Sequence, residues 1–246
     1  MALSTDTILL ATVKMVAKIH ATFPAIHLDV GSGHGDLIAL LRERYDGITS
    51  TACDYTETLM QLSDVPVVVA DLNTEKLPFA DNSFNLVTCT EVIEHLEHYR
   101  ETLREIHRIL KNEGTFVVTT PNILNLKSRI RFLMYGFYNL FGPLHFKESA
   151  LHSAGGHINP VSLFYLIHSL IDAGFSNIQV SIDKPQGSSR FWLLFLYAPI
   201  KLFSAIIEKK EKRKYKTIDA HNQNYVSMMN SVDILLGRTI IVGCKK

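Results

Sequence analysis

Short apolar runs alternate along the chain with longer segments whose apolar residues recur at helical spacing. An amphipathic helix is expected first, over residues 5–21. The strand-like runs that follow are rich in β-branched residues, and helical patterns separate them. Strands are predicted at residues 25–30, 47–54, 65–71, 83–90 and 114–120, and helices at 36–45, 56–62 and 98–110. This alternation predicts βαβ units, and therefore a parallel sheet in an α/β fold.

After the fifth predicted strand the regular alternation stops, and it resumes in a different order. A helix is predicted over residues 161–175, followed by strands at 176–183 and 238–246. Residues 122–160 and 184–237 separate these elements, and both segments greatly exceed the usual connection of about 2 to 6 residues. Both are therefore interpreted as insertions, serving as a helical substrate cap or as a contact with a membrane or a partner.

Length and composition are those of an ordinary globular protein. The 246 residues are 47% hydrophobic and 20% charged, which suffices for one sizeable core without disulfides. A single domain over residues 1–246 is expected to carry both insertions. Cys53, Cys89 and Cys244 include no C-x-x-C pair, so they are predicted to be buried thiols in a reducing compartment. Because the N-terminal residues lack the features of a secretory signal, a cytoplasmic location is expected.

Charge is spread unevenly along the chain. The whole sequence has 25 Lys and Arg against 24 Asp and Glu, a net charge of +1. Residues 208–246 contain 9 Lys and Arg against 4 Asp and Glu, so this end is basic and the rest of the chain is slightly acidic. A protein that binds nucleic acid is usually more basic overall. No nucleic-acid partner is therefore expected.

A glycine-rich turn follows the first predicted strand in LDVGSGHGDL, residues 28–37. It places Gly31, Gly33 and Gly35 where the carboxyl end of a strand meets the ligand crevice of such folds. Asp36 stands where the dinucleotide fingerprint has its third glycine, and a carboxylate at a helix N-terminus would repel a pyrophosphate. The turn therefore favours a cofactor without phosphates and argues against a nicotinamide-dependent oxidoreductase.

The next two predicted strands also end in carboxylates. Asp54 ends the second strand, at the spacing from the glycine turn that suits contact with the hydroxyls of a ribose. Asp71 ends the third strand and is suited to accept a hydrogen bond from the exocyclic amine of adenine, while Leu72 offers an apolar face to the ring. The strand ends together predict a site for a phosphate-free nucleoside.

These residues, in this order, resemble the class I S-adenosylmethionine-dependent methyltransferases, including the ubiquinone-type O-methyltransferases. The resemblance covers residues 26–121, from Asp29-x-Gly31-x-Gly33-x-Gly35 to LPFADNSFNLVTCTEVIEHL, and extends to the C-terminal helix and strands. It implies a Rossmann-like, doubly wound sheet of seven strands, mostly parallel with a reversed last strand. It also implies an enzyme with S-adenosyl-L-methionine as cofactor.

The resemblance implies a role for each residue of the glycine turn and strand ends. Asp29 orients the turn near the amino-acid end of the cofactor, the glycines admit the cofactor, and Asp54 holds its ribose. Tyr55 and Leu72 flank the adenine, and Asp71 meets its amine. The cofactor-binding residues so implied are Asp29, Gly31, Ser32, Gly33, Gly35, Asp54, Tyr55, Asp71, Leu72 and Thr90.

The run EVIEH, just beyond the fourth predicted strand, places Glu91, Glu94 and His95 at i, i+3 and i+4 on one face of a helical turn. Similar residues bind a divalent ion in ubiquinone-type O-methyltransferases and RNA 3'-end methyltransferases, and such ligands suit magnesium, manganese or zinc. Alternatively, His95 caps or packs the helix while the glutamates bond backbone amides. Both alternatives stay open here, and no metal ligand is assigned.

Candidate catalytic residues are His95, His157 and Glu94. His157 lies in GGHINP, between glycines and the start of a helix, a position that suits a general base. His145, His152 and His157 belong to the loop that usually caps the substrate in this family, and any of them is a candidate further metal ligand. Each is otherwise a solvated loop histidine.

Two segments combine apolar, aromatic and basic residues. FWLLFLYAPIKLFSAII, residues 191–207, precedes the basic run EKKEKRKYK, and residues 127–141 have a similar composition. Seventeen residues make a helix of only about 25 Å, shorter than the roughly 30 Å hydrocarbon core, so a membrane span is not expected. An anionic membrane surface, a cap over the site and a homodimer interface remain alternatives. A peripheral location at the inner face of a membrane is thus one expectation.

The favoured function is methyl transfer to a small-molecule, lipid-linked or saccharide acceptor, at oxygen. The alternative is a catalytically silent protein of the same fold that binds the cofactor and serves a regulatory or membrane-associated role.

Overall fold

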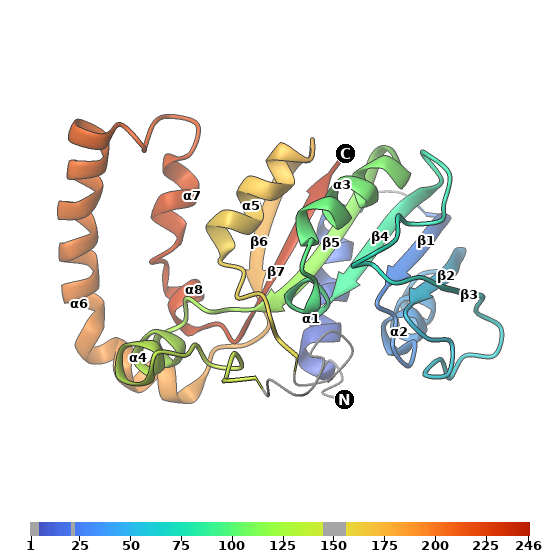
Figure 1. The fold of residues 1–246 in the computed structure, drawn as a ribbon, viewed down its shortest axis with the longest axis horizontal. Helices are drawn as coiled ribbons and strands as arrows, with labels where there is room; N and C mark the ends of the chain where they lie inside the picture. Colours follow the sequence, from blue (N-terminus) through green and yellow to red (C-terminus); the bar gives the residue numbers. More distant parts are fainter. Residues whose placement is uncertain (1–4, 21–22, 145–155) are drawn as a thin grey trace.

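The computed structural model describes residues 5–20, 23–144 and 156–246, and its centre is a twisted sheet of seven strands (Figure 1). The strand order is β3-β2-β1-β4-β5-β7-β6. The strands are β1 (Ala25–Val30), β2 (Ile48–Asp54), β3 (Val67–Val69), β4 (Phe84–Thr90), β5 (Leu110–Pro121), β6 (Ser176–Ile182) and β7 (Thr239–Lys245).

The direction of the strands confirms the predicted fold class. The first five strands pair in parallel, and β7 runs antiparallel to both of its neighbours, β5 and β6. Parallel sheets are buried on both faces because crossover helices cover them. Leu28 of β1 and Val87 of β4 accordingly have no exposed surface. The chain therefore has the Rossmann-like sheet with a reversed last strand.

Helices cover both faces of this sheet. Neighbouring residues of β5 show the division, because Val117 packs with Val16 of α1 on one face and Phe116 packs with Leu103 of α3 on the other. The helices are α1 (Asp6–Ile19), α2 (Asp36–Arg44), α3 (Tyr99–Ile109), α4 (Leu126–Tyr135), α5 (Leu163–Asp172), α6 (Gly187–Lys210), α7 (Gln223–Met228) and α8 (Val232–Leu236), with the 3-10 turn η1 (Ile93–His95) and the π turn η2 (Glu211–Tyr215).

One predicted helix is wrong. Residues 56–62 form turns and irregular structure instead. The Thr56 hydroxyl accepts a hydrogen bond from the backbone N–H of Thr58 at 3.2 Å, a local turn that competes with helix formation. Met60 and Leu62 are half-buried and lie close to Gly35 at the start of α2. Packing under the glycine turn therefore takes the place of a helix.

The two segments interpreted as insertions form the helices α4 and α6 to α8, at the β6 edge of the sheet and far from β1 to β3 (Figure 1). The chain leaves the sheet after β6, runs out along α6, and returns through α7 and α8 to β7. Cys53, Cys89 and Cys244 are buried free thiols, as predicted.

Candidate functional site

The glycine turn joins β1 to α2 with three residues in the left-handed region. Gly31, Gly33 and Gly35 have φ values of 71°, 53° and 85°, which glycine adopts without steric cost. At Gly31 a side chain is also excluded by contact, since a Cβ atom would lie 2.2 Å from a methyl group of Val92. The turn therefore depends on glycine, and it packs directly against Val92, the residue just before η1.

Asp54 fixes the shape of this turn from the end of β2. One of its carboxylate oxygens accepts the N–H of Gly33 at 2.9 Å, and the other accepts the N–H of Tyr55 at 2.8 Å. Asp54 is buried, and each carboxylate oxygen has a second lone pair for a further donor. Asp54 is thus able to hold the turn and still accept hydrogen bonds from a ligand.

Asp29 belongs to a buried hydrogen-bonded chain that crosses the sheet. The Thr88 hydroxyl donates to Asp29 at 2.6 Å, so His27 Nε2 must donate to Thr88 at 2.8 Å. His27 Nδ1 is then the acceptor for the hydroxyl of Ser50 at 3.1 Å. Burial raises the pKa of Asp29 to about 7 and lowers the pKa of His27 to about 3. The histidine is therefore neutral, and the ionisation of Asp29 is sensitive to its surroundings.

The third strand end differs in part from the expectation. One oxygen of Asp71 accepts the N–H of Asn73 at 3.0 Å, so this carboxylate caps its own loop. Leu72 is half-buried against the core, and Tyr55 is 40% exposed. Leu72 and Tyr55 keep apolar surface available near the ends of β3 and β2.

Two buried hydroxyls at this edge have no hydrogen-bond partner among the residues that the structure describes: Ser32 in the glycine turn and Thr90 at the end of β4. Val30 of β1 pairs with Cys53 of β2 and with Cys89 of β4, so the residues that follow all emerge at one edge of the sheet. Unpaired buried hydroxyls cost free energy unless a partner arrives. The edge thus offers unpaired hydroxyl groups to a polar ligand.

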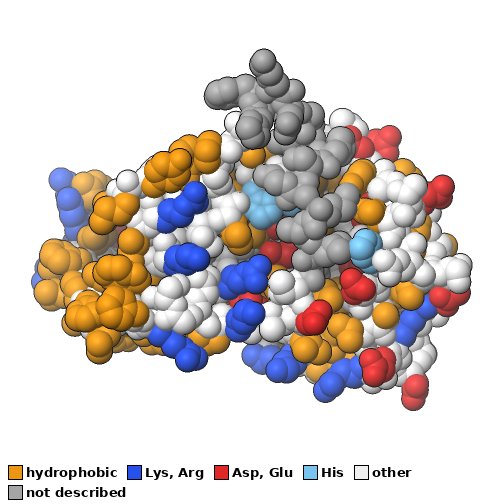
Figure 2. All heavy atoms as spheres, turned by 90° about the horizontal axis from the view of Figure 1, so that it is seen from below, with side chains coloured by type: hydrophobic (Ala, Val, Ile, Leu, Met, Phe, Trp, Pro, Cys, Tyr) orange, Lys and Arg blue, Asp and Glu red, His pale blue; other side chains and the backbone are white. Residues whose placement is uncertain are grey.

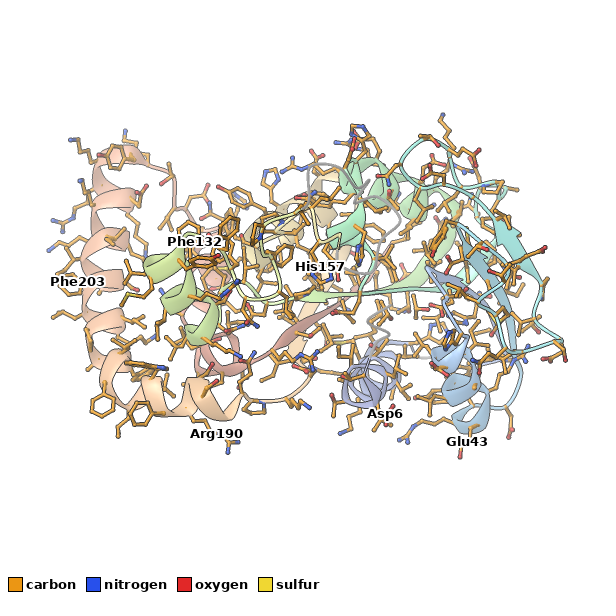
Figure 3. The ribbon with its side chains drawn as sticks, turned by 60° about the horizontal axis from the view of Figure 1, so that its bottom comes forward. Asp6, Glu43, Phe132, His157, Arg190 and Phe203 are labelled. Atoms are coloured by element: carbon orange, nitrogen blue, oxygen red, sulfur yellow. The ribbon has the colours of Figure 1, made fainter. Side chains whose placement is uncertain are left out.

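A second group lies beside this edge, where η1 meets residue 157. Glu94, His95 and His157 each offer one ligand atom, and these atoms lie within 4.8 Å of one another. The rings of the two histidines are 4.7 Å apart, in an edge-to-face arrangement. His157 lies near the middle of the molecule, between the α4 and α6 end and the β1 to β3 end (Figure 3). The structure therefore brings together the three residues predicted to be catalytic.

Hydrogen bonds leave each of these three residues with a lone pair to offer. His95 Nδ1 lies 3.2 Å from the carbonyl oxygen of Gly156 and must donate to it, which leaves Nε2 as an acceptor. His157 hydrogen-bonds the backbone of Leu140, and its Nδ1 has no partner among the described residues. One oxygen of Glu94 accepts the hydroxyl of Thr120 at 3.0 Å, and the other has no described partner. Three electron-pair donors thus converge.

Burial sets the protonation of this group. It lowers the pKa of His95 and, together with repulsion from His95, lowers the pKa of His157 to about 4, so both imidazoles are neutral near pH 7. Burial and the neighbouring Glu91 raise the pKa of Glu94. Neutral histidines beside a buried carboxyl are suited to accept a proton or to ligate a divalent cation.

The position of Glu91 differs from the sequence-based prediction that it shares a helical face with Glu94 and His95. Its φ value is 56°, so it precedes η1 in the left-handed region and does not share a helical face with Glu94 and His95. Its carboxylate accepts the hydroxyl of Thr119 at 2.9 Å. Both glutamates therefore accept hydrogen bonds from threonine hydroxyls of β5. Burial raises the pKa of Glu91 to about 7.

Sequence reasoning missed the residues that support the site. Thr120 and the Gly156 carbonyl hold Glu94 and His95, and Thr88 holds Asp29. Threonines are common in strands, so nothing in the sequence marks Thr88 or Thr120 as partners. His145 and His152, the other candidate ligands, lie outside the described residues.

Comparisons with known proteins find a family model and several relatives that are similar to part of this chain. Residues 28–118 match the family model described as a methyltransferase domain. The ubiquinone/menaquinone biosynthesis C-methyltransferase of Desulfotalea psychrophila is 32% identical over 108 residues, which cover 40% of this chain and 43% of that protein. A demethylmenaquinone methyltransferase of Thermotoga maritima is 29% identical over 133 residues, 51% of this chain and 56% of that protein. The chain thus spans about half the length of these curated relatives.

Solved structures share the fold across nearly the whole chain. A methyltransferase from Archaeoglobus fulgidus described as dependent on S-adenosylmethionine superimposes with a TM-score of 0.59 at 18% sequence identity, covering 96% of this chain and 93% of that one. At this level of identity the likeness concerns the fold.

Proposed function

This chain belongs to the class I S-adenosylmethionine-dependent methyltransferases, and from that premise we propose that it methylates an oxygen of a small apolar or lipid-linked acceptor. The observation that carries the proposal is the convergence of Glu94, His95 and His157 next to the glycine turn. Val92, at the start of η1, packs on Gly31 and so couples the two groups of residues.

The cofactor residues of this family fit the described edge of the sheet. Asp54 is placed to accept the ribose hydroxyls, Tyr55 and Leu72 to flank the adenine, and Asp29 to attract the ammonium of the amino-acid end. The hydroxyls of Ser32 and Thr90 have no hydrogen-bond partner among the described residues and are free to bond a ligand. When bound, S-adenosylmethionine supplies a methyl group already activated by the positive charge of its sulfonium. The chain mainly has to align the acceptor and exclude water.

A hydroxyl acceptor must lose its proton, and His95 is the residue we assign to receive it. Its Nδ1 is held by Gly156, so its Nε2 lone pair points away from the backbone contact and is available. Its pKa is lowered by burial, which keeps it neutral and able to accept a proton near pH 7. Glu94 lies beside it, and its ionised form stabilises the imidazolium that results. His157 is the second candidate for this role.

A divalent cation bound by the same three residues is the alternative way to activate the hydroxyl. Two neutral imidazoles and a carboxylate form a ligand set of the kind that binds zinc or manganese. The cation would lower the pKa of the bound acceptor hydroxyl, so His95 would act as a ligand in place of a base. Chelation separates the two roles, because a base does not need the ion.

An apolar acceptor is supported by the surroundings of His157. The ring of Phe141 lies 5.2 Å from that of His157, and Phe141 is buried. The quinone methyltransferases similar to this chain act, by their names, on apolar ring compounds or in their biosynthesis. Because one of these relatives is named a C-methyltransferase, transfer to carbon of a quinone-type ring is the second candidate reaction.

The test is transfer of an isotopically labelled methyl group from S-adenosylmethionine to a panel of phenols, hydroquinones and total lipid extract. We expect a labelled product with the wild-type chain and little with His95→Ala, while both proteins bind S-adenosylhomocysteine. Binding without turnover across the panel would favour the silent regulatory protein. A product labelled at carbon would show that the methyl group is transferred to carbon and not to oxygen.

A further inference from the structure

The outer face of α6 is an apolar surface that no described part of the chain covers. It consists of exposed side chains along more than four helical turns, ending in a basic run at η2. Leu194 is 79% exposed and Phe203 61% exposed. The exposed large hydrophobic residues of this outer face are Phe191, Trp192, Leu194, Phe195, Tyr197, Leu202, Phe203, Ile206 and Ile207.

Helix α4 adds a second apolar group next to α6. Its exposed residues include Leu133, Met134 and Tyr135, which are 78%, 77% and 60% exposed. Figure 2 shows hydrophobic side chains gathered at the α6 end of the molecule, with Lys and Arg side chains beside them. In Figure 3, Phe203 points outward from α6 and Phe132 lies on α4. Single exposed apolar residues are ordinary, whereas a continuous patch of this kind marks an interaction site.

The helix from Gly187 to Tyr215 is long and apolar enough to cross a membrane by length and composition, with a mean hydropathy of 1.6 in its most apolar window. Its attachments argue against a span. At the start of α6, the N–H of Gln186 donates to the carbonyl of Leu236 at 2.9 Å. Near the far half, Asn230 donates to Ser204 at 2.7 Å. A spanning α6 would carry this polar return segment into the hydrocarbon core, which is costly.

The inner and outer faces of α6 therefore differ in what they contact. The inner face consists of half-buried residues at helical spacing, which are Leu193, Leu196, Ile200, Ser204 and Glu208. This inner face packs toward α4 and α8. The outer face lies opposite, so an apolar environment is able to reach it while the helix stays attached to the domain.

Charge indicates the chemistry of that environment. Residues 187–216 contain 8 Lys and Arg but only 2 Glu. Lys209, Lys210 and Lys214 flank the apolar face at its C-terminal end, and Arg190 lies at its start. An exposed apolar helix face bordered by cations is suited to an interface whose headgroups are anionic and whose interior is hydrocarbon. A second copy of this chain would place a like-charged surface opposite, which is unfavourable.

We propose that the outer face of α6, with the exposed residues of α4, docks on the surface of an anionic lipid bilayer. The apolar side chains enter the boundary between headgroups and acyl chains, and the basic run contacts the headgroups. Docking concerns a surface apart from the cofactor edge and does not rest on the proposed methyl transfer. Its orientation places the α4 side, which leads to Phe141 and His157, toward the lipid.

The test is flotation of the full chain with vesicles of phosphatidylcholine alone or of an equimolar mixture with phosphatidylglycerol. The variant Leu194→Asp with Phe203→Asp places two charges on the outer face without touching the packed face. We expect the wild type to float with the anionic vesicles only. The double variant should partition about 100-fold less, because each buried side chain contributes roughly a tenfold factor or more.

The matched control is Tyr165→Asp with Ile171→Asp on α5, two apolar residues that are similarly exposed but lie outside the surface. It should float like the wild type. Both variants should bind S-adenosylhomocysteine normally, which separates docking from folding and from the proposed function. Absence of flotation by the wild type, equal flotation of the double variant, or equal flotation with neutral vesicles would overturn the proposal. So would a wild-type dimer that the double variant converts to monomers without any vesicle binding.

Discussion

Polar and apolar side chains are distributed in opposite ways in two regions of the molecule, residues 25–121 and the helices α4 and α6. In the first region carboxyl and hydroxyl groups are buried and hydrogen-bonded, as in the chain from Ser50 through His27 and Thr88 to Asp29. On α4 and α6, large apolar side chains are exposed and the charged ones lie around them. Buried polar groups indicate a ligand that binds inside the molecule. Exposed apolar groups indicate an external surface on which the molecule docks.

This contrast separates two kinds of failure. Changes at the strand ends should alter cofactor binding or turnover and leave vesicle binding intact. Changes on the outer face of α6 should do the reverse. The four predictions below use this separation, beginning with the largest expected effect.

The most direct way to damage the first region is Asp54→Ala. It removes the acceptor for the N–H groups of Gly33 and Tyr55 and for the ribose hydroxyls together, so the dissociation constant for S-adenosylhomocysteine should rise by about 100-fold or more. Calorimetric titration measures it. Asp64→Ala is the control, because Asp64 is an exposed carboxylate in an ion pair with Arg42. Unchanged affinity in Asp54→Ala would remove this carboxylate from the site.

The proposed catalytic group is tested by Glu94→Gln, which keeps an acceptor for Thr120 but removes the ionisable carboxyl group. We expect kcat to fall by about 10- to 100-fold while cofactor affinity stays near wild type. Glu97→Gln, at an exposed glutamate three residues on, should have wild-type activity. Assays with and without a chelator then assign the role: loss of wild-type activity identifies a metal site, and indifference identifies a base. Full activity of Glu94→Gln would exclude Glu94 from both the metal site and the base mechanism.

The pKa of Asp29, about 7, predicts opposite effects of pH on binding and stability. In the proposed role, ionised Asp29 attracts the ligand ammonium, so affinity for S-adenosylhomocysteine should rise about tenfold between pH 6 and pH 8. Because folding raises this pKa above its ordinary value, the unfolding free energy of the ligand-free protein should fall over the same rise in pH. Asp29→Asn should flatten the binding profile, which separates its contribution from that of Glu91, whose pKa is also about 7. A flat wild-type profile would contradict this role.

The smallest effect concerns one cation of the basic run. Arg213→Ala should lower partitioning onto anionic vesicles by about fivefold at low salt, since one surface charge near such a membrane contributes about 1 kcal/mol. The difference from wild type should shrink at high ionic strength, where screening removes it. Flotation at two salt concentrations measures both effects. An Arg213→Ala chain that partitions like the wild type at low salt would place η2 away from the headgroups.

Most of the fold is readable from the sequence because the strands are central and buried. Residues 25–30 form β1 with the predicted bounds, and α3 and β6 differ from prediction by a residue or two at their ends. The predicted helix at 56–62 fails because a hydroxyl bond and packing under Gly35 outweigh a short helical pattern. Tertiary contacts decide short segments, whereas periodicity decides long ones.

The site was readable in its residues but not in its contacts. The glycines, Asp54 and His95 stand out because few residue types serve at such positions. The left-handed backbone of Glu91 and the bond from Thr120 to Glu94 depend on how η1 meets β5, and no local pattern encodes that meeting. The pairing of His157 with His95 across 61 intervening residues is likewise a product of the fold.

The central claim is that the edge formed by the glycine turn, Asp54 and Asp29 binds S-adenosylmethionine. Calorimetric titration of the full chain with S-adenosylhomocysteine tests it most directly. One ligand should bind per chain, with an affinity that Asp54→Ala lowers by about 100-fold or more and that Leu194→Asp with Phe203→Asp leaves unchanged. No heat of binding from the wild-type chain at high protein concentration would contradict the claim.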